Sequence, residues 1–285
     1  MRKERCLSDR LFRIITFTIM AIFAISFIGI FFWMIFGSMR SISGFVTDPF
    51  NFFDISWKSI AKNYERAFTY KVGGTTAMPE MFLNSILFIV GTVSIGLILT
   101  SISGYIVAKY TFALRKFIIT INILVITIPT VGTVSITYRL LDTLNLLDTF
   151  FGVYLLAAGG FGFNFLLFYN YFSAIPWEYA ESAFIDGAGN FTVMLRIMMP
   201  QALPIISAVA VVSFIGSWND YYTPYMYLNS RPTVAYGINA IYQKYNASMP
   251  YVFAGMTFSA LISLGLYCAF SKTIMESMSA GGLKG

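Results

Sequence analysis

Polar side chains that could bind a solute gather in one otherwise apolar stretch, residues 217–222 (SWNDYY). An acid inside a membrane span costs about 2.5–3.5 kcal/mol on insertion scales, so Asp220 should face protein or water rather than lipid. We expect Asn84, on another apolar segment, at a similar depth. Amides, carboxylates and aromatic rings together suit a sugar, because hydroxyls need hydrogen-bond partners and pyranose faces stack on rings. An interhelical hydrogen bond beside an interfacial aromatic belt explains these residues equally well.

Residues for covalent or metal chemistry are scarce. The chain contains no histidine, which removes imidazole bases and most zinc sites. The phosphate-binding pattern G-x-x-x-x-G-K-[ST] does not occur, so the chain does not hydrolyse ATP by that route. Cys6 and Cys268 lie in a terminal tail and an apolar span, so no disulfide is expected. We therefore predict no catalytic residue, no metal site and no cofactor on this chain.

A second polar stretch, residues 173–203, lies between two apolar segments. Pro176 suits the first turn of a helix, where its missing N–H is not needed, and Glu178 favours the positive N-terminal end. Gly187 and Gly189 should interrupt that helix. A second helical piece is expected from about residue 190 to 200, with its apolar side chains on one face. The pattern predicts two short helices joined by a bend at the membrane surface.

The elements that carry these residues should be membrane spans. The chain is 57% hydrophobic and 11% charged, with mean hydropathy +0.71, whereas soluble domains carry about 25% charged residues. Charge-free windows longer than about 18 residues are candidate spans. We predict an all-α polytopic membrane protein with six transmembrane helices, at about residues 14–36, 81–108, 117–138, 150–172, 203–228 and 251–270.

The basic residues lie beside the spans and form no single face, which argues against nucleic-acid binding despite a net charge of +6. Lys and Arg concentrate in residues 1–13 and in the second connection, and this bias predicts that both termini and the 173–203 loop are cytoplasmic. The predicted organisation is a tail at residues 1–13, a permeation domain at 14–272 and a tail at 273–285. Residues 37–80 should form a partly helical cap on the outer side.

Glycine and proline within the predicted spans suggest how the helices pack. Gly96, Thr100 and Gly104 repeat every four residues, a spacing of small side chains that lets helix backbones approach closely. Pro129 should kink the third span. The glycine-rich middle of the fourth span, residues 159–162, suits a helix buried inside the bundle.

Residues 181–200 follow the pattern E-S-A-x3-G-x9-I-x-M-P. This resembles the EAA signature of ABC importer permeases, E-A-A-x3-G-x9-I-x-L-P, with Ser182 and Met199 as departures that keep size or polarity close. The resemblance implies the type I ABC importer permease fold and identifies the 173–203 loop as a coupling helix that docks on a separate ATPase subunit. The residues it assigns to ATPase coupling are Glu178, Glu181, Ser182, Ala183, Asp186, Gly187, Ala188, Ile197 and Pro200.

Further matches resemble the carbohydrate branch of that family, including the D-G-A at residues 186–188, the N-S at 84–85, the N-Y at 63–64 and the terminal G-x-x-K-G. They imply a bacterial cytoplasmic (inner) membrane protein that forms the path for a carbohydrate, expected to be an oligosaccharide. The implied partners are ATPase subunits that hold ATP and Mg, a sister permease and an extracytoplasmic solute-binding protein. The residues expected along the substrate path are Asn84, Trp218, Asn219, Asp220, Tyr221 and Tyr222.

Three alternatives remain open at this stage. An ion-coupled secondary transporter would need a carboxylate near the membrane midplane, often within repeated halves, and only Asp220 is a candidate. An intramembrane enzyme is disfavoured by the missing histidines and paired acids. An ABC importer permease for a non-sugar solute, such as a polyamine or phosphate, is the strongest alternative, because substrate choice rests on few residues.

Overall fold

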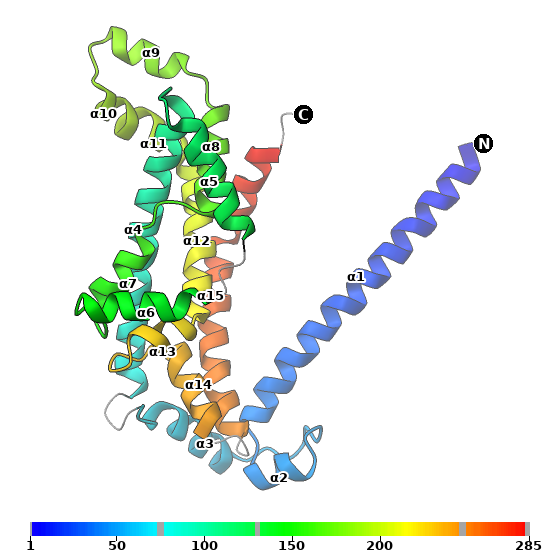
Figure 1. The fold of residues 1–285 in the computed structure, drawn as a ribbon. Helices are drawn as coiled ribbons and strands as arrows, with labels where there is room; N and C mark the ends of the chain where they lie inside the picture. The colour runs from blue at the N-terminus through cyan, green and yellow to red at the C-terminus, as the bar shows by residue number, and fades with distance from the viewer. Residues whose placement is uncertain (1, 73–76, 129–131, 245–248, 283–285) are drawn as a thin grey trace. The chain divides into compact units, whose positions relative to one another are not determined.

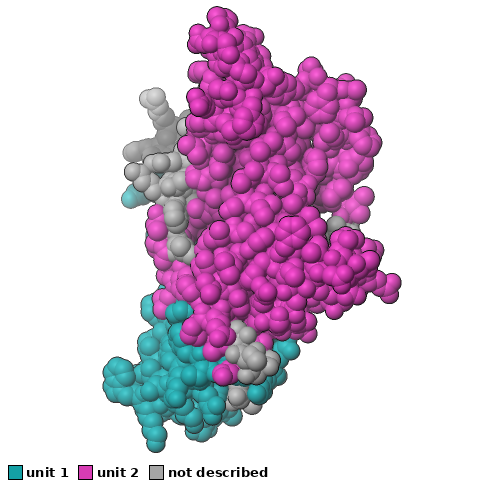
Figure 2. All heavy atoms as spheres, turned by 90° about the vertical axis from the view of Figure 1, so that its left-hand side faces the viewer, with its two compact units in different colours: residues 1–70, 238–260 teal, residues 71–237, 261–285 magenta. Residues whose placement is uncertain are grey.

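The computed structural model describes residues 2–72, 77–128, 132–244 and 249–282, and these residues are helical apart from connections and one isolated bridge between Arg40 and Ile55 (Figure 1). The chain forms two compact units. Unit 1 comprises residues 1–70 and 238–260, and unit 2 comprises residues 71–237 and 261–285 (Figure 2). Two helices, α14 (Val234–Lys244) and α15 (Met249–Gly282), contribute residues to both units. The prediction of an all-α chain is confirmed.

Unit 1 contains α1 (Arg2–Ser38), α2 (Ile42–Thr47) and α3 (Trp57–Thr69). Because α1 begins at Arg2, the residues predicted as a separate tail continue the first span as helix. The side chain of Asn63 is buried on α3, and its amide nitrogen donates to the carbonyl oxygens of Ser38 and Arg40, both at 2.8 Å. The amide therefore ties α3 to the end of α1, and residues 37–80 are partly helical as predicted.

Unit 2 is built around α4 (Met78–Lys109), which packs against α7 (Phe150–Ala157), α8 (Phe163–Ala174) and α12 (Leu203–Asn219). The small residues that repeat along α4 lie in these contacts. A Cβ added at Gly104 would lie 2.7 Å from the Cβ of Phe168 and 3.1 Å from the backbone nitrogen of Tyr169. The buried Thr100 hydroxyl donates to the Gly96 carbonyl at 2.6 Å. The predicted close-packing face of α4 is confirmed.

The two glycines of this face should respond differently to a methyl group. At Gly104 an alanine would clash with α8 backbone and Cβ atoms, and overpacking of this kind costs about 1–3 kcal/mol. At Gly96 the added Cβ would lie 3.7 Å from the Ala157 carbonyl oxygen, an ordinary contact. We expect Gly104→Ala to lower the thermal unfolding temperature of the detergent-solubilised protein. Gly96→Ala is the control and should leave it unchanged or raise it, and equal effects would contradict the packing.

The fourth predicted span is not one helix, because glycines break it between α7 and α8. Gly160 and Gly162 adopt φ values of 67° and 106°, which side chains with a Cβ rarely tolerate. The exposed backbone groups find partners nearby. The Asn122 carboxamide oxygen accepts from the Gly162 N–H at 2.7 Å, and the Ser103 hydroxyl donates to the Gly160 carbonyl at 2.6 Å. The glycine-rich segment is therefore a break stabilised by side chains, not the middle of a buried helix.

The third and fifth predicted spans are also interrupted. The third is divided into α5 (Arg115–Thr127) and α6 (Thr133–Thr143), and Pro129, where we predicted a kink, lies outside the described residues. The fifth ends at Asn219 instead of continuing to residue 228, and the short helix α13 (Tyr222–Tyr227) follows. The last span is longer than predicted, because α15 runs on to Gly282 and includes most of the predicted C-terminal tail.

Within the described residues, three helical segments are long and apolar enough to cross a membrane as single helices, namely Arg10–Ser38, Met78–Lys109 and Met249–Ala269. A fourth candidate is a pair, Asn190–Gln201 and Leu203–Asn219, whose axes bend by 71°. The predicted six spans are thus not six uninterrupted helices, since the third and fourth are each divided in two.

Candidate functional site

The polar loop between α8 and α12 begins with α9 (Glu178–Ile185), which starts two residues after Pro176. Glu178 and Glu181 both lie in its first turn, where a negative charge favours the helix N-terminus. Ala180 and Ala183 are buried in a cluster that includes Phe172 and Val193. The small side chains of α9 therefore let it lie close against its neighbours, as the predicted first helix of the loop.

The end of α9 explains the glycine of the signature. Gly187 has a φ of 82°, its N–H donates to the Phe184 carbonyl at 3.0 Å, and the N–H of Ala188 donates to the Ala183 carbonyl at 2.9 Å. These two bonds form a Schellman motif, in which a left-handed residue just beyond the helix satisfies its last carbonyls. Ala188 packs against the same buried cluster that contains Ala183. Gly187 thus sets the bend between the two helices of the loop.

The second half of the loop is helical, as predicted, but with a change of pitch. It consists of α10 (Asn190–Val193), a π-helix (Met194–Met198) and α11 (Met199–Gln201). The widened turn directly precedes Pro200, whose ring would crowd the carbonyl four residues earlier in a regular α-helix. Val193 and Met198 are fully buried, Ile197 is half-buried and Pro200 is exposed. Val193, Ile197 and Met198 therefore face the body of unit 2, whereas Phe191 and Leu195 are exposed.

Side chains outside the signature hold the loop, and the sequence analysis did not identify them. The Tyr110 hydroxyl donates to the side-chain oxygen of Asn190 at 3.2 Å, and the Tyr110 ring packs edge-on against Trp177 at 6.0 Å. The Lys109 ammonium donates to the Ile175 carbonyl and lies 5.9 Å from the Trp177 ring centroid. The sequence signal that could have identified Lys109 and Tyr110 is their position directly after a predicted apolar span. The end of α4 therefore anchors both halves of the loop.

The outward surface of the loop combines acids with large apolar side chains. Ile185 is 87% exposed and Phe191 69%, and Tyr179 also projects into solvent. Exposed apolar side chains rimmed by polar ones are typical of a protein interaction surface. Of the residues predicted for coupling, Ala183 and Ile197 pack inward and Ala188 is half-buried. The others are exposed: Glu178, Glu181, Ser182, Asp186, Gly187 and Pro200.

Apart from Asn84, which lies on α4, the residues predicted for a substrate path lie at the junction of α12 and α13, towards the opposite end of unit 2 from α9 (Figure 1). Trp218 is buried, with its ring 5.9 Å from Phe82 and 6.5 Å from Phe214. The Phe82 contact brings the second turn of α4, which carries Asn84, close to the last turn of α12. The buried Trp218 ring therefore helps to fix the position of the α12–α13 junction relative to α4.

The polar members of this group have local partners. One carboxylate oxygen of Asp220 accepts from the N–H groups of Tyr222 and Thr223 at 2.9 and 3.0 Å, which caps α13. The amide nitrogen of Asn219 donates to the Ile215 carbonyl at 2.9 Å, and that of Asn84 donates to the Pro232 carbonyl at 3.1 Å. Asp220 thus lies at a helix junction and not inside a continuous span. Its second carboxylate oxygen takes no part in this cap.

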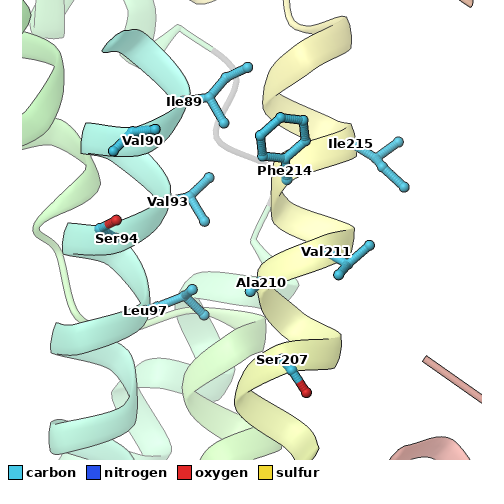
Figure 3. A pocket seen from close by; sticks show the side chains of 10 residues that line it. All are labelled: Ile89, Val90, Val93, Ser94, Leu97, Ser207, Ala210, Val211, Phe214 and Ile215. Carbon is cyan, nitrogen blue, oxygen red and sulfur yellow. The ribbon is translucent and has the colours of Figure 1, made fainter. Parts of the chain in front are cut away.

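An apolar groove of about 480 Å³ runs between α4 and α12 (Figure 3). Its side chains come from residues 89–97 of α4 and 207–215 of α12, and only Ser94 and Ser207 are polar. A sugar would find almost no hydrogen-bond partners there. This groove is therefore a different kind of surface from the polar junction at residues 217–222.

Residues 96–277 match the family described as "Binding-protein-dependent transport system inner membrane component". The chain belongs to this family. It is a multi-pass permease of the inner membrane and a component of a binding-protein-dependent ABC transporter. Permeases of this family carry no catalytic activity of their own, so the chain is a transport subunit and not an enzyme. An ion-coupled secondary transporter is thereby set aside.

Two sequence relatives cover most of the permease. It is 27% identical over 280 residues to a diacetylchitobiose uptake permease of Streptomyces coelicolor, covering 96% of this chain and 90% of that protein. It is 27% identical to a maltodextrin transport permease of Streptococcus pneumoniae, covering 78% and 79%. A crystal structure of a bacterial ABC transporter that imports the acidic polysaccharide alginate matches with a TM-score of 0.75 at 22% identity, covering 93% and 97%. The ABC importer permease fold is confirmed.

Proposed function

We propose that this permease forms the translocation path for a carbohydrate, specifically an oligosaccharide. Two kinds of support agree. The relatives include permeases named for diacetylchitobiose, maltodextrin and arabinooligosaccharides. The α12–α13 junction offers amide and carboxylate groups beside the exposed rings of Tyr221 and Tyr222, which matches what a sugar needs. A relative named for uptake of osmoprotective compounds makes a smaller solute the alternative.

The loop at residues 173–203 transmits ATP-driven movement to the helices. The observation that carries this proposal is the construction of the loop, which has an inner face packed against α4 and α8 and an outer face with exposed Ile185 and Phe191. A rigid, bent element of this kind can be pushed by a docked ATPase without unfolding. ATP and Mg bind to that ATPase, and closure of the ATPase dimer moves α9 and switches the path from inward-open to outward-open.

The substrate path in this proposal passes Asn84, Asn219 and Asp220, with Tyr221 and Tyr222 as stacking surfaces. Trp218 has a supporting role, because its buried ring holds α12 against the start of α4. The apolar groove of Figure 3 suits a helix of a sister permease better than a sugar, since only two of its lining residues are polar. An extracytoplasmic binding protein delivers the sugar, and both termini and the 173–203 loop are cytoplasmic.

The test is transport by the purified permease reconstituted with its native partners in proteoliposomes. Uptake of labelled oligosaccharides should require both ATP and the binding protein, and it should survive an uncoupler. A panel of maltodextrins, chitooligosaccharides, arabinooligosaccharides and small osmolytes identifies the solute. Transport of only the small osmolytes would overturn the oligosaccharide assignment, and transport without ATP would overturn the mechanism.

Substitutions at the junction separate a substrate contact from a structural cap. Asp220→Asn keeps an oxygen that can accept from the N–H groups of α13, so the cap is retained, but it removes the charge. A hydrogen bond to a charged group contributes about 1.5–3 kcal/mol. If Asp220 contacts sugar, Asp220→Asn should raise KM about tenfold or more with normal unfolding temperature. Thr223→Ala is the control, because this substitution leaves in place the backbone N–H that donates to Asp220 and does not alter the charge of the junction. An unchanged KM would leave Asp220 a cap only.

A further inference from the structure

Unit 1 contains a polar pocket of about 460 Å³ that the transport function does not use. It lies between the residues that follow α1 and the first two turns of α3. Lys58 and Lys62 project from successive turns of α3, and three serine hydroxyls and the Asn63 amide complete the polar lining. The lining residues are Ser41, Ile42, Ser43, Lys58, Ser59, Lys62 and Asn63. Two cations with hydroxyl donors, and no acid in this lining, favour an anionic ligand.

The surrounding charges strengthen that preference. Arg40 is 2% exposed, and one guanidinium nitrogen donates to the Gly44 carbonyl at 2.9 Å. Its Nε and Nη1 atoms have no hydrogen-bond partner, and the guanidinium carbon lies 5.7 Å from the Phe45 ring centroid. The first turn of the 13-residue helix α3 adds the positive end of its dipole. One acid contacts a lining residue: the Asp54 carboxylate accepts from the Ser41 hydroxyl at 3.4 Å. Within the pocket lining both charged side chains, Lys58 and Lys62, are cations, although the wider connection also carries Asp48, Glu65 and Arg66.

The pocket lies at the level where a membrane surface is expected. The apolar segment Arg10–Ser38 of α1 ends three residues before Ser41. The connection that follows exposes large aromatic side chains in the same unit, with Phe53 95% and Trp57 86% exposed. Aromatic side chains of this kind are enriched at the membrane–water interface, between headgroups and hydrocarbon. The lysines of the pocket are therefore within reach of lipid headgroups.

A second, apolar cavity of about 580 Å³ lies on α1 in the same unit. Its lining from α1 lies 5 to 12 residues before Ser38, which is about 8–18 Å along the helix axis and hence at hydrocarbon depth. Phe50 and Phe52 from the following connection form its other wall. The lining residues are Ser26, Gly29, Ile30, Trp33, Phe50 and Phe52.

From these two cavities we propose that unit 1 binds an anionic phospholipid of the leaflet that the C-terminal end of α1 reaches. The headgroup phosphate occupies the pocket with Lys58 and Lys62, and an acyl chain occupies the groove beside Gly29. The apolar groove is what favours a lipid over a soluble phosphate. The bound lipid would hold the connection of residues 37–70 against the membrane. This site depends on membrane insertion and is independent of which solute is transported.

The test is lipid retention by the full-length permease. The protein is purified with its native partners, released from nanodiscs and analysed by native mass spectrometry. Phosphatidylglycerol should be retained over phosphatidylcholine. Each lysine near an anionic surface contributes about fivefold in affinity, so the double variant Lys58→Gln/Lys62→Gln should bind phosphatidylglycerol roughly twenty-five-fold more weakly. Lys71→Gln removes a charge just beyond this connection, outside the pocket and outside unit 1, and should have no effect. Equal retention of both lipids, or an unaffected double variant, would overturn the proposal.

A second variant addresses the acyl chain without touching the charges. A Cβ added at Gly29 would meet no atom within 4 Å, so leucine fits on the helix and projects into the groove. Gly29→Leu should weaken phosphatidylglycerol retention while transport of the solute continues. Inorganic phosphate at millimolar concentration should compete poorly. If phosphate displaces the lipid fully and Gly29→Leu has no effect, the pocket binds a free anion and the lipid assignment fails.

Discussion

Replacing Gly187 by proline is expected to abolish ATP-driven solute uptake, while Gly189→Ala leaves it unchanged. Gly187 has a φ of 82°, and proline is locked near −65°. Proline also removes the N–H that donates to the Phe184 carbonyl at 3.0 Å. Gly189 has a φ of −83°, and added Cβ atoms meet nothing within 4 Å at either glycine. The two positions therefore differ in backbone angle and not in available space.

An alanine at Gly187 gives a graded version of the same experiment. A side chain in the left-handed region costs about 1–2 kcal/mol, so Gly187→Ala should reduce uptake roughly five- to thirtyfold by depopulating the bent loop. Uptake in proteoliposomes is the main measurement, and the rate of limited proteolysis within residues 173–203 reports on the loop itself. Normal uptake by Gly187→Pro would show that the bend has no part in coupling.

Ile185→Asp is expected to prevent the ATPase from co-purifying with the permease. The side chain is 87% exposed, so the substitution should leave the folding of the permease intact. Burial of an isoleucine contributes about 1.5–3 kcal/mol, and an aspartate in its place would bring an unpaired charge into the interface. The loss of affinity should therefore exceed tenfold.

The control for this second prediction keeps the apolar character of the position. Ile185→Leu should retain the ATPase and support uptake. Thermal unfolding of the isolated permease should be the same for both variants, which separates docking from stability. If Ile185→Asp retains the ATPase at wild-type level, the exposed apolar side chains of α9 are not the docking surface, although the family assignment stands.

Local sequence signals were sufficient for the coupling loop. Pro176, the two early glutamates and Gly187 each act through backbone chemistry within a few residues, so their effects are readable without a structure. Gly189, also predicted to interrupt the helix, lies at the bend in an extended conformation that other residues adopt. The two helices and the bend between them were predicted correctly for this reason. The close approach at Gly104 was also predicted, because small residues every four positions mark one helix face. The role of this loop in coupling stays a prediction.

Other features depended on partners distant in the sequence. Composition marked residues 150–172 as a span, but the positive φ angles of Gly160 and Gly162 are stabilised by Ser103 and Asn122, which belong to other helices. No residue close to these glycines in the sequence indicates such partners. In the same way, Tyr110 and Lys109 hold a loop more than sixty residues away.

The sequence by itself determined that this chain is helical and spans a membrane, because hydropathy and short-range backbone preferences are properties of contiguous residues. The permease role followed from the resemblance of residues 181–200 to the EAA signature. Only the tertiary structure decided where the helices break, that Trp218 is buried against Phe82, and that Asp220 caps α13 instead of lying within a span. Long-range contacts make the first two choices, because Ser103 and Asn122 satisfy backbone groups at the break between α7 and α8 and because Phe82 packs against Trp218. The Asp220 cap uses nearby N–H groups, which become available because α12 ends at Asn219.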